Sequence, residues 1–189
     1  MRLRFLTRVA FSASLVFLLS LCLSCASLMP HFKGEAIEQE TVLDLQHAYS
    51  KKRSDCLAVC TDMVLHYYGV ETLVPDIALP LDLTSLSRSL NTDTPVDDEG
   101  HVLFATVLQL SPEEITAHLA RQRPLIVAFK PSAREEYHGV VVSGYCTDRD
   151  RFFINDPARR RPSWKKLSKI PTFEDSGRYL VLLIGLGEK

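Results

Sequence analysis

The chain has 189 residues, of which 46% are hydrophobic and 24% are charged, a balance typical of a globular protein with one full-sized core. Its formal net charge of −1 excludes the strongly basic surface on which nucleic-acid binding depends, so we expect no nucleic-acid partner. Residues 41–189 contain no Cys-x-x-Cys pair and no His-Glu-x-x-His motif, so we expect neither a metal site nor a cofactor.

The first 24 residues have the layout of a secretory signal. Arginines precede an apolar stretch from residue 9 to residue 23, and Cys25 follows a small residue. This pattern resembles the lipobox of bacterial lipoproteins, in which the cysteine becomes the lipidated N-terminus. Two alternatives stay open, a plain cleaved signal and an uncleaved membrane anchor, although the apolar stretch is shorter than the roughly 20 residues of a spanning helix.

All three alternatives place the rest of the chain outside the cytoplasm. We expect a lipoprotein that is anchored in the membrane of the cell envelope by a lipid such as palmitate on Cys25 and faces the periplasm or the exterior. Residues 25–40 are mixed and polar and predict a tether, and residues 41–189 predict the folded domain.

An amphipathic helix with a cysteine in its first turn follows a short predicted strand at residues 42–45. Its apolar residues recur at three-and-four spacing from Asp55 onward, and Gly69 ends it. Cys56 lies in the first turn, where unpaired backbone N–H groups and the helix dipole favour a negative charge. The thiolate is the nucleophile of cysteine peptidases, so Cys56 is a candidate nucleophile.

The remaining segments predict helices first and consecutive strands later. Ser111-Pro112-Glu113-Glu114 has the residues of a helix start, with a capping residue and proline at the first helical position. The expected elements are helices at 81–90 and from 111 onward, and strands at 101–110, 125–129, 137–145, 151–155 and 179–184. This order and the short turns predict an α+β fold with an antiparallel sheet.

His138 and Asp156 are the candidate partners of Cys56. His138 lies where a loop becomes a strand, and Asp156 ends the next strand. A tight turn between adjacent antiparallel strands brings these residues near each other, which suits an imidazole held by a carboxylate. The strand must pack against the helix that carries Cys56, because only one sheet is available. The three residues therefore predict a nucleophile, a base and an orienting group.

The cysteine count leaves at least one free thiol. Cys22 and Cys25 belong to the signal, and Cys56, Cys60 and Cys146 remain as an odd number in an oxidising compartment. Cys60 lies one helical turn beyond Cys56 on an apolar face, which predicts a small buried side chain. A disulfide between Cys60 and Cys146 is a second interpretation.

Four spaced motifs run through most of the domain. They are Asp55-Cys56 with an apolar helix ending in Tyr67-Tyr68-Gly69, then Arg123-Pro124-Leu125-Ile126-Val127, His138-Gly139-Val140-Val141-Val142-Ser143-Gly144-Tyr145 and Asn155-Asp156-Pro157-Ala158. Together they resemble the bacteriocin-processing cysteine peptidases, the family that acts on double-glycine leaders. The resemblance implies a papain-like fold, with Cys56 as nucleophile, His138 as base and Asp156 as orienting group.

Two departures from that family's pattern surround the cysteine. Leu57 stands where the family has glycine, and we expect its side chain to narrow the approach to the scissile bond. The family's oxyanion-binding glutamine lies six residues before the cysteine, where this chain has Ser50. Gln46, four residues further back, is the candidate oxyanion donor if the loop is longer. Family members are often joined to an export ATPase, but no P-loop motif occurs here, so we expect a free-standing version.

These features predict a thiol-dependent peptidase that cleaves a peptide or protein substrate through an acyl-enzyme. One alternative is a catalytically inactive papain-like lipoprotein that binds a peptide or a partner in the cell envelope. Another is a transglutaminase-like acyl transferase, which has the same order of Cys, His and Asp.

A basic patch follows Asp156. Charge runs are usually exposed, so the patch predicts a solvated loop, and contact with anionic lipid or with acidic residues of a substrate is the alternative. Its members are Arg159, Arg160, Arg161, Lys165, Lys166 and Lys169.

Overall fold

The computed structural model describes residues 40–52, 55–70, 83–91, 93–130, 137–173 and 176–188, which belong to the unit Glu38–Lys189. The predicted signal, Cys25 and nearly all of the predicted tether lie outside the described residues. Within the described ranges, no helix combines the length and the apolar character that a membrane span requires.

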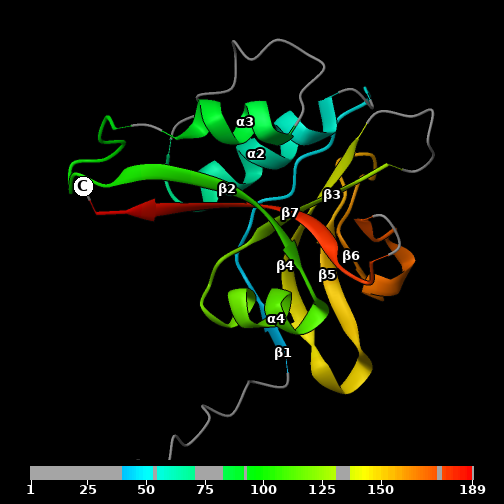
Figure 1. The fold of residues 1–189 in the computed structure, drawn as a ribbon. Coiled ribbons are helices and arrows are strands. Elements are labelled where there is room, and N and C mark those ends of the chain that lie inside the picture. The colour runs from blue at the N-terminus through cyan, green and yellow to red at the C-terminus, as the bar shows by residue number, and fades with distance from the viewer. Residues whose placement is uncertain are drawn as a thin grey trace, which may run out of the picture. The chain divides into compact units, whose positions relative to one another are not determined.

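One antiparallel sheet of seven strands forms the centre of this unit (Figure 1). Its strands are β1 (Glu40–Val42), β2 (Val102–Leu110), β3 (Leu125–Phe129), β4 (His138–Cys146), β5 (Arg151–Asn155), β6 (Ser163–Lys165) and β7 (Tyr179–Gly187). Six of them follow the order β2-β7-β3-β4-β5-β6. The seventh, β1, pairs with residues 144–146 of β4, while β3 pairs with residues 138–142.

Helices cover both faces of the sheet (Figure 1). The helices α2 (Cys56–Tyr67) and α3 (Leu83–Leu90) pack on one face, and α4 (Pro112–Ala120) packs on the other. Two 3-10 helices lie in the connections: η2 (Thr147–Arg149) joins β4 to β5, and η3 (Leu167–Lys169) follows β6.

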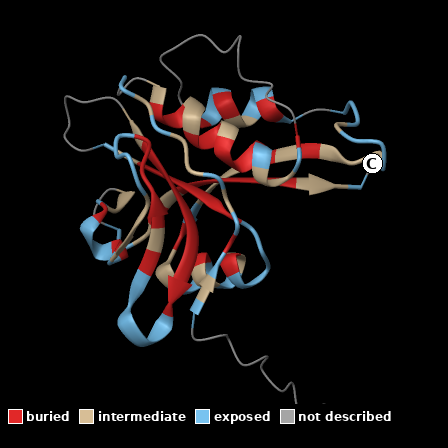
Figure 2. Ribbon diagram, turned by 180° about the vertical axis from the view of Figure 1, so that it is seen from behind, coloured by how far each residue is buried: buried red, intermediate tan, exposed pale blue. Residues whose placement is uncertain are grey.

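Burial on both faces explains the continuous apolar run of β3. Ile126 and Ala128 belong to the core cluster of α2 and α3, whereas Leu125 and Val127 belong to the cluster of α4. Figure 2 shows the central strands as buried. Because successive side chains of a strand point to opposite faces, a sheet covered on both sides needs apolar residues at consecutive positions.

The predicted α+β class and antiparallel sheet are confirmed. The predicted start of α4 is also confirmed, because the Ser111 hydroxyl accepts a hydrogen bond from the Glu114 backbone N–H at 3.3 Å. The Glu114 carboxylate in return accepts from the Ser111 N–H at 2.7 Å, which completes a capping box.

Two short strands differ from the prediction. The strand expected at residues 42–45 is β1 and ends at Val42, because the Leu45 N–H donates to the Leu43 carbonyl at 2.9 Å and turns the chain. β6 was not predicted, since three residues are too few to show an alternating pattern. Trp164 anchors it to β5 by packing on Phe153, with ring centroids 5.2 Å apart.

Candidate active site

Cys56, His138 and Asp156 come together where α2 meets the sheet. Cys56 begins α2, His138 begins β4 and Asp156 directly follows β5. Val141 pairs with Asn155 across β4 and β5, so His138 and Asp156 lie at the same end of neighbouring strands. Because α2 packs on β4, the first turn of the helix reaches this end of the sheet.

The His138 side chain interacts with both of the other two side chains. His138 Nε2 lies 3.0 Å from Asp156 Oδ1, and the Cys56 side chain lies close enough to the imidazole to help raise its pKa. Because Nε2 faces Asp156, Nδ1 is the ring nitrogen left for the Cys56 sulfur. Phe129 packs edge-on against the imidazole, with ring centroids 5.3 Å apart. A thiol, an imidazole and a carboxylate in this order can act as nucleophile, base and orienting group.

The Asp156 carboxylate is held through both oxygens. Oδ1 also accepts a hydrogen bond from the Ala158 backbone N–H at 3.0 Å, and Oδ2 accepts from Arg159 Nε at 3.3 Å. Lys165 Nζ lies 3.9 Å from Oδ2. Burial would raise the pKa of Asp156, but the hydrogen bond and charge of His138 outweigh burial, and the pKa falls to about 2.

The imidazole of His138 has the complementary shift. Burial disfavours the protonated ring, but the hydrogen bonds with Asp156 and Cys56 outweigh burial and raise the pKa of His138 to about 9. The stability that His138 contributes is therefore complete below its ordinary pKa of 6.5 and is lost as pH rises through about 9. The stability from Asp156 is complete above its ordinary pKa of 3.8 and is lost as pH falls through about 2. Near neutral pH His138 therefore carries a positive charge beside the Cys56 side chain.

Gly139 allows α2 to approach β4 closely. A Cβ at this position would lie 2.7 Å from Leu57 Cδ2 and 3.5 Å from Cys60 Sγ. Leu57 and Cys60 are both buried, and Gly139 directly follows His138. The contact therefore determines how closely the helix of Cys56 packs on the strand of His138.

The expectation that Leu57 narrows the approach to the scissile bond is wrong. Its side chain is only 3% exposed and belongs to the core cluster beneath α2. It points inward because this side of the helix faces β4 at Gly139. The departure from the family's glycine at this position thus adds core packing.

All three cysteines of the described ranges are free and buried, so Cys60 and Cys146 do not form a disulfide in this structure. Burial, followed by the negative charges of Cys56 and Asp156, raises the pKa of Cys60 well above its ordinary value. Cys60 is therefore a neutral thiol packed beside the site, and its predicted burial is confirmed.

The loop before α2 packs against the turn after Asp156. The Ser50 N–H donates to the Pro157 carbonyl at 2.9 Å, and His47 Nε2 donates to the Arg159 carbonyl at 2.9 Å. The sequence did not single out His47, since the partners are 112 residues apart in the chain and no local pattern connects them.

Ser50 and Gln46 lie in the loop before α2, where a side-chain donor for an oxyanion is expected. The Ser50 hydroxyl donates to the Lys52 carbonyl at 3.1 Å, so its hydrogen bond stabilises the loop in which it lies. Gln46 is exposed, and its role as oxyanion donor stays a prediction.

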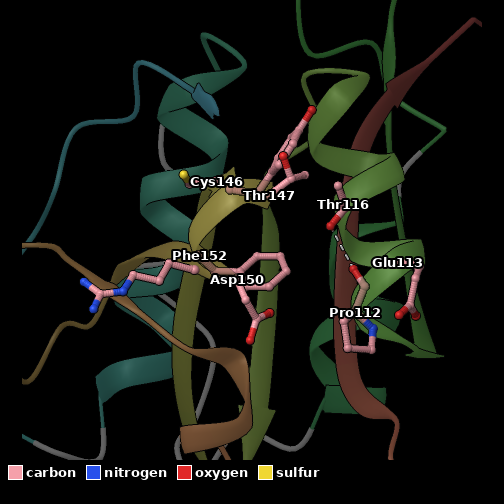
Figure 3. Close-up of a pocket in the computed structure, with 9 residues that line it drawn as sticks. Pro112, Glu113, Thr116, Cys146, Thr147, Asp150 and Phe152 are labelled. Carbon is pink, nitrogen blue, oxygen red and sulfur yellow. Dashed lines mark hydrogen bonds between the residues drawn. The ribbon is translucent and has the colours of Figure 1, made fainter. Parts of the chain in front are cut away.

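A separate cavity of about 180 Å³ lies at the opposite end of β4 from His138 (Figure 3). The start of α4 and the β4–β5 hairpin line it, including Glu113, Cys146 and Asp150. None of the three candidate catalytic residues lines this cavity, so it is not the candidate active site. Across the described ranges, His, Cys, Asp and Glu side chains form no group of three that could hold a metal ion.

Comparison with known proteins identifies the family. The model of the Peptidase_C39-like family matches residues 37–181. The chain is also similar to a double glycine motif protease from an AMS/PCAT transporter, whose crystal structure contains the leader peptide. The two are 16% identical, with 78% of this chain and 94% of that chain covered and a TM-score of 0.43. No curated protein matches.

The family model covers most of the chain, so the chain belongs to the Peptidase_C39-like family. Its class is that of cysteine-type peptidases, in agreement with the class predicted from the sequence.

We expect Gly139→Ala to lower the free energy of unfolding by about 1–3 kcal/mol, because the added methyl group overlaps Leu57. Leu57→Ala is also destabilising, since it leaves a cavity in the core. In the double variant, Leu57→Ala removes the atoms that the new methyl group would overlap. The double variant should therefore lose less free energy of unfolding than the two single variants lose together. Urea denaturation of all four proteins measures this coupling. Additivity within about 0.5 kcal/mol would contradict the close contact.

Proposed function

We propose that this chain hydrolyses peptide bonds through a Cys56–His138–Asp156 triad. The observation that carries the proposal is the 3.0 Å hydrogen bond between His138 and Asp156, with the Cys56 side chain beside the same imidazole. Membership in a cysteine peptidase family supports a peptide as the substrate.

The reaction follows from the charges of the three groups. The Cys56 thiolate attacks the carbonyl carbon, and the carbonyl electrons move onto the oxygen. As the C–N bond breaks, protonated His138 donates its proton to the leaving amine and a thioester remains. Water then attacks the thioester, His138 takes a proton from the water, and the C–S bond breaks to restore the thiolate. Asp156 orients the imidazole and stabilises its positive charge.

The oxyanion of each tetrahedral intermediate needs hydrogen-bond donors. The first-turn amides of α2 have no acceptor within the helix and lie beside Cys56. We propose Gln46 as the side-chain donor, because its exposed position in the loop before α2 leaves the amide group accessible. Loss of one such donor typically costs roughly 10²–10³ in rate.

A catalytically inactive peptide-binding protein is the second candidate function. Cys56 is only 1% exposed, which restricts the access of a scissile bond to the sulfur. Ser50 in place of the family's glutamine also favours this candidate. The reactivity of the thiol distinguishes the two functions.

We expect iodoacetamide to alkylate Cys56 at pH 6 at least tenfold faster than it alkylates Cys56 in the His138→Ala variant, because the imidazolium stabilises the thiolate. As pH rises through about 9, His138 loses its proton and the two rates converge. Mass spectrometry of the peptide that contains Cys56 measures the rates, with buried Cys146 as an internal comparison. Ordinary thiol behaviour in both proteins, with a midpoint near pH 8.5, would favour the inactive candidate.

We expect Cys56→Ala to abolish hydrolysis of a library of internally quenched peptides, because the nucleophile is lost. Asp156→Asn lowers kcat by up to roughly 10⁴, since the amide cannot stabilise the imidazolium. Cys146→Ala is the matched control and keeps the activity of the unaltered chain. Hydrolysis that survives Cys56→Ala would exclude the proposed mechanism.

We also propose that Cys25 carries a lipid that anchors the domain in the cell envelope, on the periplasmic or outer side. The support is the signal-like sequence before it. We expect labelled palmitate to enter the unaltered chain and the Cys22→Ala control but not the Cys25→Ala variant. Equal labelling of all three proteins would contradict the assignment.

A further inference from the structure

A second cavity, of about 300 Å³, lies beside the candidate triad. Its apolar wall comes from the core cluster on the α4 side of the sheet, and three cationic side chains and one carboxylate line the remainder. The lining residues are Phe129, Val140, Ile154 and Ile170, with Asp156, Arg159, Lys165 and Lys169.

We propose that this cavity is a specificity subsite that binds a glutamate side chain of the peptide substrate. The inference rests on the proposed peptidase function and adds a feature of the substrate. It also assigns part of the basic patch after Asp156 to substrate recognition.

The charges in the cavity favour a second carboxylate. Three cationic side chains face one carboxylate, Asp156, whose charge is already shared with His138 at 3.0 Å and Arg159 at 3.3 Å. Burial and the neighbouring Arg159 lower the pKa of Lys165, while Asp156 raises it. An added anion would offset the repulsion between Lys165 and Arg159, and it would gain charge-assisted hydrogen bonds.

The shape of the lining selects an anion with an aliphatic stem. Val140, Ile154 and Ile170 form a buried apolar floor, while Arg159 and Lys169 are exposed. The methylene groups of a glutamate can cover the floor while its carboxylate meets the cations. A small inorganic anion would leave the floor exposed to water, which is unfavourable.

Two side chains that line the cavity also contact the His138 imidazole. Asp156 lines the cavity and is hydrogen-bonded to His138, and Phe129 lines it while packing on the same imidazole at 5.3 Å. A side chain held in the cavity therefore lies next to the general base. A glutamate bound in the cavity would lie on the Asp156 side of the imidazole, and peptides varied one position at a time identify the position that supplies it.

Pairs of internally quenched peptides that differ only by glutamate or glutamine, one position at a time, test the inference. We expect kcat/KM to be roughly tenfold higher with glutamate at one position of the peptide, and this ratio to fall at high salt. Lys169→Met lowers the ratio at least threefold, because it removes a cation that the glutamate carboxylate meets in the cavity.

Lys166→Met is the matched control, since it removes the same charge from a neighbouring residue. Lys166 Nζ lies 3.6 Å from Asp150 Oδ2, and Lys166 does not line the cavity. We expect this variant to keep the full preference for glutamate. Equal kcat/KM within every peptide pair, or equal losses from the two lysine variants, would overturn the inference and leave the peptidase function intact.

Peptide binding provides a readout that does not depend on turnover. If no peptide is cleaved, fluorescence anisotropy measures peptide binding to the Cys56→Ala chain. Tighter binding of the glutamate peptide than of its glutamine partner, with the difference lost in Lys169→Met, would still support the subsite. Vesicles of phosphatidylglycerol and of phosphatidylcholine test a lipid headgroup instead. Lys169-dependent binding to phosphatidylglycerol vesicles, without any preference for glutamate peptides, would overturn the inference.

Discussion

The hydrogen bond between His138 Nε2 and Asp156 Oδ1 connects the sheet to the candidate chemistry. It forms because β4 and β5 are antiparallel neighbours, so that the start of one strand lies beside the end of the other. It also contributes to both large pKa shifts of the site, since each group stabilises the charged form of the other. The orientation of the imidazole toward Cys56 depends on this bond and on the close packing of α2 at Gly139.

Asp156 has a second role in the local structure because its two oxygens face different partners. Oδ1 holds His138, and Oδ2 contacts Arg159 and Lys165, which line the neighbouring cavity. The carboxylate thereby keeps two cations at the edge of the sheet while its own charge is compensated by the imidazolium. Substrate recognition and base orientation would then share one residue.

Local chemistry explains which parts of this arrangement were predictable. The capping box at Ser111 was predictable because its hydrogen bonds join residues three apart in the chain. The approach of His138 to Asp156 was predictable because a tight turn joins their strands. The direction of the Leu57 side chain was not predictable, because a residue in the first helical turn can face either a cleft or a strand. Only the packing of α2 on Gly139 determines which of the two it faces. The contact between His47 and Arg159 also escaped prediction, since it depends on how two distant loops meet.

The sequence by itself determined the α+β order of elements, the family, and the three residues proposed for catalysis, because periodicity and motif spacing act over short stretches of chain. The tertiary structure alone decided the burial of Leu57, the neutral state of Cys60 and the cavity beside Asp156. Each of these depends on side chains from several elements that pack together, and burial and charge at such a place are set by neighbours that are distant in the sequence. In the basic patch, the structure likewise separated Lys169, which lines the cavity, from Lys166, which pairs with Asp150.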